Sequence, residues 1–374
     1  MTPRERLTAV LKRQVPDTVP IFVRGVSPFG ERMNWMGKHD PSYERLRSFV
    51  LANTDILYGI GLESGVFLSA AAQDKRTVIR EDDEWKDIES LIETPRGPIR
   101  SVTRVSKRDY FDDQIEYYIK DAEDFERFMS IPYVPVRPEV KETIRAKDRE
   151  VGEHGLVAVG IPSVVGCAHA LFGSEGLAMW SVLERDRLNA LFTMLQRRTL
   201  EWVELILKEG AGPVLTYGGP ELAVPPLMSP RDFHDFVTII DRPINDLVHK
   251  HGRWTCIHCH GKLDKVLEEF IEIGVDILEP VEAPPGGNVA LADVKRRIGD
   301  KVILMGNMPY EAIISWPPDR IETRVKADCE AAMAGGSYIM MPAASPFERV
   351  LTDKGFEGYK TYVLSGRKYG RYPQ

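Results

Sequence analysis

Residues 254–261 read Trp254-Thr-Cys-Ile-His-Cys-His-Gly261, a short apolar run that passes into polar residues and closes on a glycine. This pattern predicts a buried strand that runs into a loop. Because successive side chains of a strand point to opposite faces, Cys256, His258 and His260 are expected on one face. The segment therefore predicts a strand of a buried sheet that carries two imidazoles at its end.

Seven further apolar runs resemble this strand, and most are followed by a helix-like stretch. The eight runs are 19–24, 55–61, 156–161, 214–217, 254–258, 277–281, 302–305 and 338–341, and amphipathic segments follow at 231–251, 262–273, 291–299 and 319–334. Alternation of this kind predicts parallel βαβ units, and eight units predict a (β/α)8 TIM barrel. The alternative is an open doubly wound sheet, which the missing Gly-x-Gly-x-x-Gly after the first run disfavours.

Two stretches lie outside a minimal barrel. Residues 1–18 predict a helical lead-in, and residues 64–138 contain β-prone pieces at 77–82, 97–106 and 114–120, then a short helix at 121–130. We interpret 64–138 as an insertion of hairpin character after the second strand, either a lid or a dimer contact. Residues 1–374 are then a single barrel domain.

Composition excludes several classes of protein. Hydrophobic residues make up 43% and charged residues 28% of the 374, as in an ordinary soluble globular protein. A net charge of −7 argues against nucleic-acid binding. No apolar run approaches the roughly 20 residues that span a bilayer. Four scattered cysteines and a charged, helix-like start indicate a reducing cytoplasm rather than secretion.

The two histidines are the first candidates for chemistry. Imidazoles at His258 and His260 could hold a zinc ion, with Cys, Asp or Glu completing the ligands. The alternative is a pair of structural histidines bonded to the backbone. His-Cys-His-Gly at a strand end favours a metal or catalytic site.

Further candidates follow from the barrel, because the chemistry of such folds lies at the carboxyl ends of the strands. These ends meet at one opening of the barrel, which we call the mouth. The residues expected there are Arg24, Tyr217, Glu221, Glu282 and Asn307. Arg24, Tyr217 and Asn307 are candidates for substrate binding, and Glu221 and Glu282 for catalysis. The alternatives are a structural ion pair for Arg24, packing for Tyr217, a turn for Asn307 and solvated loops for the two glutamates.

Strand alternation also separates two neighbouring carboxylates. Counting from Asp276, residues Leu278 and Glu282 share a face, so Glu282 is expected to point inward rather than Glu279. Glu282 is therefore the carboxylate expected near the two histidines.

Four segments together resemble the uroporphyrinogen decarboxylase superfamily. They are Cys-Ile-His-Cys-His-Gly-Lys at 256–262, Gly-Val-Asp-Ile-Leu-Glu-Pro-Val-Glu-Ala-Pro-Pro-Gly-Gly-Asn at 274–288, Met-Gly-Asn-Met at 305–308 and Gly-Gly-Ser-Tyr-Ile-Met-Met-Pro at 335–342. The resemblance implies a (β/α)8 barrel. The superfamily includes true decarboxylases and corrinoid-dependent methyltransferases.

The sequence departs from the decarboxylase branch. That branch has Met-Arg-Gln-Ala-Gly-Arg-Tyr after strand one, whereas residues 23–29 read Val-Arg-Gly-Val-Ser-Pro-Phe and match only at Arg24. The methyltransferase branch has His-x-Cys-Gly and a later Cys, to which His258, His260 and Ala344 correspond. With both thiolates absent, the resemblance implies a harder zinc site of His258, His260 and a carboxylate such as Glu282. Such a site suits an oxygen substrate such as an aryl methyl ether.

The resemblance thus implies O-demethylation, with the methyl group passed to the cobalt(I) corrinoid of a partner protein. A homodimer is implied on the same basis. Two alternatives stay open: a decarboxylase of a small carboxylic acid that Arg24 would bind, and a non-catalytic barrel. Inward polar groups argue against the latter, because they cost stability when buried.

Overall fold

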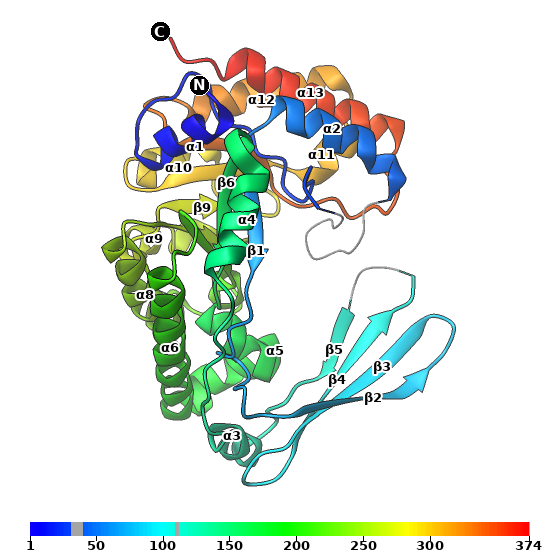
Figure 1. The fold of residues 1–374 in the computed structure, drawn as a ribbon, viewed down its shortest axis with the longest axis vertical. Helices are drawn as coiled ribbons and strands as arrows, with labels where there is room; N and C mark the ends of the chain where they lie inside the picture. Colours follow the sequence, from blue (N-terminus) through cyan, green and yellow to red (C-terminus); the bar gives the residue numbers. More distant parts are fainter. Residues whose placement is uncertain (31–39, 109–111, 374) are drawn as a thin grey trace.

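A computed structural model describes residues 1–30, 40–108 and 112–373, and its centre is a seven-stranded parallel sheet (Figure 1). The strand order is β1-β6-β7-β8-β9-β10-β11, so each strand lies beside the next one in the chain apart from the insertion. The strands are β1 (Ile56–Gly61), β6 (Gly155–Gly160), β7 (Val214–Gly218), β8 (Trp254–His258), β9 (Ile277–Glu279), β10 (Ile303–Met308) and β11 (Tyr338–Pro342). Seven of the eight predicted strands are therefore confirmed.

The predicted first strand, 19–24, forms only an isolated parallel bridge between Ile21 and Met340. The amide of Phe22 donates to Met340 O, and the amide of Met340 donates to Pro20 O, both at 2.8 Å. On the other side, Asp55 N donates to Ile21 O at 2.8 Å. The segment thus lies between β11 and the start of β1, in a TIM-like arrangement. A complete eight-stranded barrel remains a prediction.

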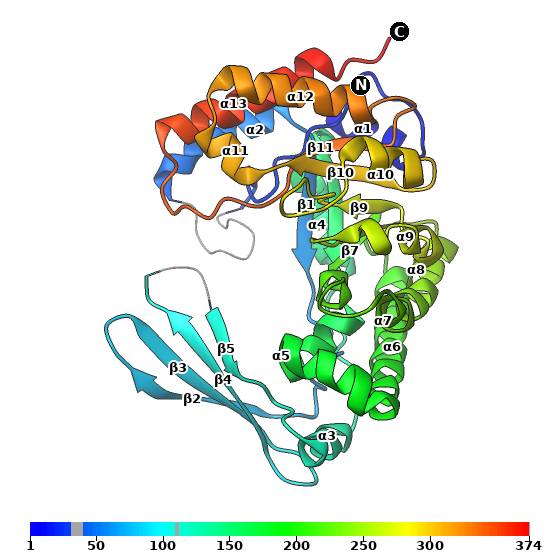
Figure 2. The same ribbon diagram turned by 180° about the vertical axis from the view of Figure 1, so that it is seen from behind.

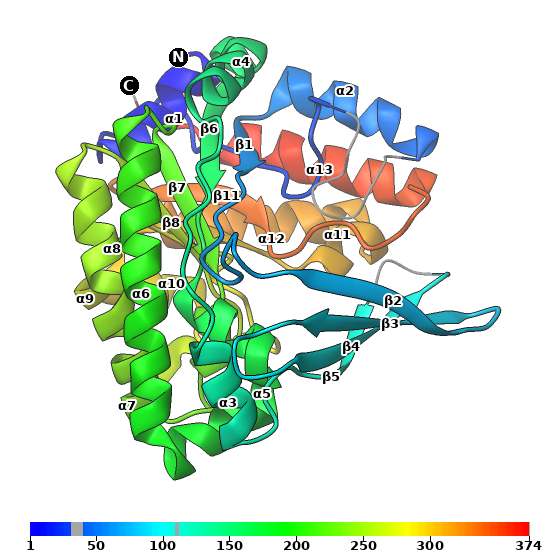
Figure 3. The same cartoon turned by 60° about the horizontal axis from the view of Figure 1, so that its bottom comes forward.

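Helices cover the outer face of the sheet, as the alternation predicted. Figure 3 shows α6 and α8 side by side along one flank. The helices are α1 (Pro3–Leu11), α2 (Glu44–Asn53), α3 (Ala122–Met129), α4 (Lys141–Val151), α5 (Val164–Leu183), α6 (Arg185–Lys208), α7 (Pro230–Phe233), α8 (Ile239–Lys250), α9 (Glu269–Ile273), α10 (Leu291–Ile298), α11 (Tyr310–Ser315), α12 (Pro318–Ala332) and α13 (Asp353–Tyr369). Short 3-10 turns lie at Pro41–Tyr43, Gly152–His154, Pro220–Ala223 and Leu263–Lys265, and a π-helical turn at His234–Thr238.

The core has two layers. The inner cluster joins alternate residues of the strands, among them Ala158, Cys256 and Ile277, to Leu7 and Val10 of α1. A larger cluster fills the space between the sheet and the outer helices. Because α1 packs its apolar face on the inner cluster, the helical lead-in closes the amino-terminal end and leaves the opposite end for a site.

The insertion forms a separate antiparallel sheet of order β2-β3-β4-β5, which projects away from the parallel strands (Figure 2). Its strands are β2 (Asp74–Glu81), β3 (Trp85–Ile92), β4 (Ile99–Ser106) and β5 (Asp112–Glu116). This agrees with the predicted hairpin character. Gly173, at φ +71° inside α5, lets the Tyr117 ring approach so closely that a Cβ would stand 2.4 Å from it. Ile119 N also donates to Leu171 O at 3.0 Å, so a break in α5 anchors the sheet.

Two sequence expectations concern the whole chain. Among the described residues, no helix is both long and apolar enough to span a membrane. The cysteines form no disulfide, since Cys167, Cys256, Cys259 and Cys329 all carry free thiols.

Candidate functional site

Two imidazoles meet at the carboxyl end of β8. Cys256 belongs to the inner cluster, so His258, two residues later on the same strand, also faces inward. His260 follows on the loop, and the two ring centroids are 4.6 Å apart at 81°. The structure thus brings the predicted pair together at the mouth of the sheet.

A carboxylate that the sequence reasoning passed over completes this end of the site. Glu279 Oε2 accepts a hydrogen bond from Arg24 Nη1 at 2.6 Å, and its Oε1 lies 3.4 Å from His258 Nδ1. Ile277 belongs to the inner cluster and Leu278 to the outer one, so Glu279 is the residue that faces inward. The expectation that Glu282 would face inward rather than Glu279 is wrong for the strand itself, because β9 ends at Glu279 and Glu282 lies on the loop beyond it.

Neighbouring charges determine the protonation state of Glu279, a residue that is only 5% exposed. Burial alone would raise its pKa, but the charge of Arg24 and the adjacent His258 ring outweigh burial and lower the pKa to about 2. For Arg24, burial opposes the charge, yet Glu279 keeps its pKa above the ordinary value. Glu279 is therefore a carboxylate at neutral pH, and the predicted ion-pair alternative for Arg24 is what the structure shows.

Of the two predicted glutamates, Glu282 lies beside His260, and Glu221 lies on the turn that follows β7. Glu282 Oε2 is 3.3 Å from His260 Nδ1 and accepts from Gly261 N at 3.2 Å. Its hydrogen bond with His260 is the main cause of a lowered pKa. Glu221 Oε2 accepts from Gly219 N at 3.0 Å, and its charge helps to raise the pKa of Arg24. Each imidazole thus has its own carboxylate beside it.

Two other predicted residues lie elsewhere. Tyr217 is 5% exposed, and its hydroxyl accepts from Asn245 on α8 at 2.8 Å. Asn307 is 1% exposed, and its Oδ1 accepts from Arg324 on α12 at 3.2 Å. Both side chains are held by the outer helices, which corrects the expectation that they bind substrate.

The predicted zinc ligands do not gather around one point. Among the described residues, the group whose ligand atoms all lie within 4.8 Å of one another is His234, Glu269 and Glu272, a possible metal-binding triad at the surface. Nδ1 of His258 is buried without a hydrogen-bond partner, yet the nearest carboxylate is Glu279, itself committed to Arg24. The set His258, His260 and Glu282 therefore does not fit zinc in this arrangement.

Glycines leave room beside the histidines. A Cβ on Gly59 or Gly61 of β1 would meet no atom within 4 Å, and one on Gly160 of β6 would meet only Ile60 O at 3.5 Å. On β7, Gly218 lets His258 pack closely, since a Cβ there would stand 3.3 Å from the ring. The carboxyl halves of β1 and β6 therefore leave open space where side chains would otherwise stand.

Comparisons with known proteins agree with this architecture. A family model for uroporphyrinogen decarboxylase matches residues 112–347, more than half of the chain. A solved methyltransferase from Methanosarcina mazei shares 17% identity with a TM-score of 0.63, and the match covers 99% of each chain. That likeness is one of fold.

A 3-keto-D-glucoside 4-epimerase from E. coli matches at 12% identity over 69% of this chain and 96% of its own, but its TM-score of 0.33 supports no argument. No curated protein sequence matches the chain. On the family match, the chain belongs to the uroporphyrinogen decarboxylase family.

Proposed function

We propose that this protein is a methyltransferase that moves a methyl group from a small methylated donor, an aryl methyl ether, to the cobalt(I) corrinoid of a partner protein. The observation that carries the proposal is the pair His258 and His260, which lie side by side at the mouth and each face a carboxylate. Family membership and the fold likeness to a methyltransferase support it.

The chemical need is a better leaving group. An aryl methyl ether resists transfer because phenoxide departs poorly, and a proton on the ether oxygen lowers that barrier. The corrinoid, when bound, supplies the nucleophile that accepts the methyl group. This chain must then bind the donor, deliver a proton and keep the donor oriented.

The histidines suit proton delivery. In both rings Nδ1 faces a carboxylate, and no described residue hydrogen-bonds to Nε2, which is left for a substrate oxygen. Glu282 would orient the His260 ring, and the charges of Glu279 and Glu282 would offset the positive charge of an imidazole that carries the proton to be delivered. Glu221 would orient the donor. The geometry assigns no step to zinc.

The test is an anaerobic incubation of the protein with cob(I)alamin and a panel of methoxylated phenols, read from the cobalamin spectrum. We expect methylcobalamin and the free phenol from the wild-type protein. Since general acids contribute 10²–10⁴-fold, His258→Ala and His260→Ala should slow transfer by about 10²-fold or more. His251→Ala, at the end of α8, is the matched control. Unimpaired transfer in both site variants would overturn the assignment of the acids.

Two further measurements test the corrinoid partner and the metal. Free cobalamin should support slow transfer, and a purified corrinoid protein should accelerate it if the acceptor is protein-bound. Metal analysis of the purified protein checks the zinc prediction. Zinc that is bound stoichiometrically and lost from His258→Ala would return the histidines to the role of ligands.

A decarboxylase of a small acid is the alternative, since Arg24 lies at the mouth. Its Nη1 is already bound to Glu279 at 2.6 Å, so its charge is paired before any substrate carboxylate arrives. Release of carbon dioxide from a carboxylic acid without cobalamin would identify this activity.

A further inference from the structure

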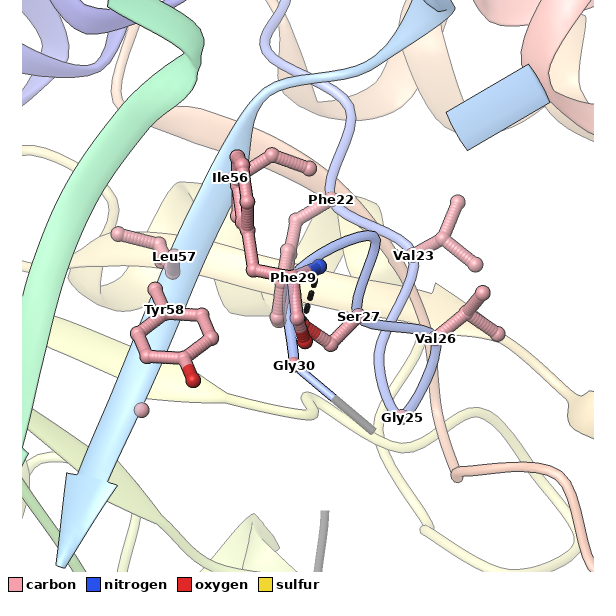
Figure 4. Close-up of a pocket in the computed structure, with 11 residues that line it drawn as sticks. Phe22, Val23, Gly25, Val26, Ser27, Phe29, Gly30, Ile56, Leu57 and Tyr58 are labelled. Carbon is pink, nitrogen blue, oxygen red and sulfur yellow. Dashed lines mark hydrogen bonds between the residues drawn. The ribbon is translucent and has the colours of Figure 1, made fainter. Parts of the chain in front are cut away.

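A cavity of about 340 Å³ lies between residues 22–30 and strand β1, beside the mouth (Figure 4). Aromatic and aliphatic side chains dominate its lining, including Phe22, Phe29, Tyr58, Val26 and Ile56. Phe29 and Tyr58 meet edge to face, with ring centroids 5.9 Å apart at 82°. Its volume falls in the range of small-molecule pockets, about 300–1,000 Å³, and its walls suit a flat apolar group.

The loop that forms one wall is held in place from two sides. Arg47 of α2 donates to Ser27 O at 2.9 Å, and to Pro28 O and Gly30 O at 3.3 and 2.5 Å. At the other end, Gly25 has φ +78° and approaches the loop after β11, where a Cβ would stand 2.5 Å from Ser345 Cβ. The cavity is therefore preformed, which reduces the entropy cost of binding.

The cavity exists because the sheet is not closed here. Strand β1 pairs with β6 along Ile56–Gly61. On the other side of β1, the backbone hydrogen bond that joins the described residues to segment 19–24 is the one from Asp55 N to Ile21 O. Beyond that bond the two segments diverge, and the cavity fills the gap between them. Backbone groups of β1 face it together with the aromatic rings.

Gly59 connects this cavity to the mouth. It lines the cavity, and it lies on the same strand face as Leu57, which packs on the inner cluster. A Cβ on Gly59 would meet no atom within 4 Å, so a wall of the cavity is open at the inward face of β1.

We propose that this cavity binds the aromatic ring of the methyl donor, with the methoxy group reaching the mouth past Gly59. The inference rests on the proposed function for the donor class. The larger cavity of about 530 Å³ under the antiparallel sheet has a mixed lining, in which the charged Arg76 and Asp112 stand beside aromatic side chains such as Phe67. Within the part of the chain that the structure describes, charged side chains are absent from the lining of the cavity beside β1.

The experiment measures ring binding without any corrinoid. Phenol and 2-methoxyphenol are titrated against the protein by ligand-observed NMR, for the wild type, Gly59→Ala, Gly59→Leu and Gly61→Leu. Residue 61 shares the strand and the open surroundings of Gly59 but does not line the cavity, so Gly61→Leu is the matched control for phenol. Urea midpoints check folding, and they should not fall, because a glycine inside a strand is unfavourable.

We expect phenol to bind the wild type and Gly61→Leu alike, about tenfold more weakly to Gly59→Leu, and with an intermediate loss to Gly59→Ala. Equal phenol affinity in Gly59→Leu, or no phenol binding to the wild type, would overturn the proposal. Failure of this proposal can be distinguished from failure of the proposed function. Methyl transfer from an aryl ether with unchanged ring binding in Gly59→Leu refutes the cavity alone, whereas Gly59-dependent ring binding without any methyl transfer refutes the proposed function alone.

Discussion

Arg24→Met tests the electrostatic core of the site through protein stability. In the wild type, Arg24 Nη1 lies 2.6 Å from Glu279 Oε2, and Glu279 is 5% exposed. Removing the guanidinium leaves the buried Glu279 carboxylate beside His258 and without its arginine partner. Methionine keeps the length and the apolar stem, so the lost charge is the main change.

The magnitude follows from two independent routes. The pKa of Glu279 is held at about 2, against an ordinary value of 4.5, and each unit corresponds to about 1.4 kcal/mol, which gives up to about 3 kcal/mol. Breaking one partner of a buried ion pair costs about 3–5 kcal/mol. We therefore expect the free energy of unfolding at pH 7 to fall by about 3 kcal/mol.

The pH dependence has a defined sign. Because the folded pKa of Glu279 is depressed, its contribution is fully present above about pH 4.5 and is lost as the pH falls toward 2. The stability difference between the wild type and Arg24→Met should therefore narrow across this window.

A double-mutant cycle measures the coupling free energy between Arg24 and Glu279. It compares urea unfolding of the wild type, Arg24→Met, Glu279→Gln and the double variant. The double variant should recover most of the loss, since it buries two neutral side chains in place of one uncompensated charge. Additive single effects, within about 0.5 kcal/mol, would refute the reasoning that this pair is coupled.

Three further perturbations address other parts of the fold. Asp55→Ala removes a buried carboxylate that accepts from Arg6 Nη1 at 2.5 Å and from Ile21 N at 2.8 Å, so urea unfolding should show a loss of about 3–5 kcal/mol. Burial raises the pKa of Asp241 to about 8 from an ordinary 3.8, so the folded state holds a proton that the unfolded state releases. Wild-type stability should fall between about pH 4 and pH 8 by up to about 1.4 kcal/mol per unit, and Asp241→Asn should flatten that slope in urea titrations at several pH values. Gly173→Ala should release the antiparallel sheet, because a Cβ at φ +71° would collide with Tyr117; faster limited proteolysis within residues 64–138 checks this.

Much of the fold follows from local sequence pattern. The strand Trp254–His258 has the predicted bounds, because an apolar run closed by polar residues and glycine is read without knowledge of its neighbours. The pairing of His258 and His260 follows from the same short segment. The hairpin character of the insertion was predicted from the pieces at 77–82, 97–106 and 114–120, but the strand Trp85–Ile92 was not predicted.

Tertiary structure decided which carboxylate completes the site. Alternation of side chains holds only within a strand, and β9 ends at Glu279, so counting on to Glu282 crossed a strand end that the sequence does not mark. The same limit applies to Tyr217, whose inward or outward direction depends on how β7 pairs with its neighbours. The partner of Arg24 is 255 residues away, and the cavity beside Gly59 arises from a gap between two segments. By itself the sequence determined the strands and the residue types at their ends. Only packing and long-range pairing determined which side chains share the mouth, because contacts between distant segments have no local signature.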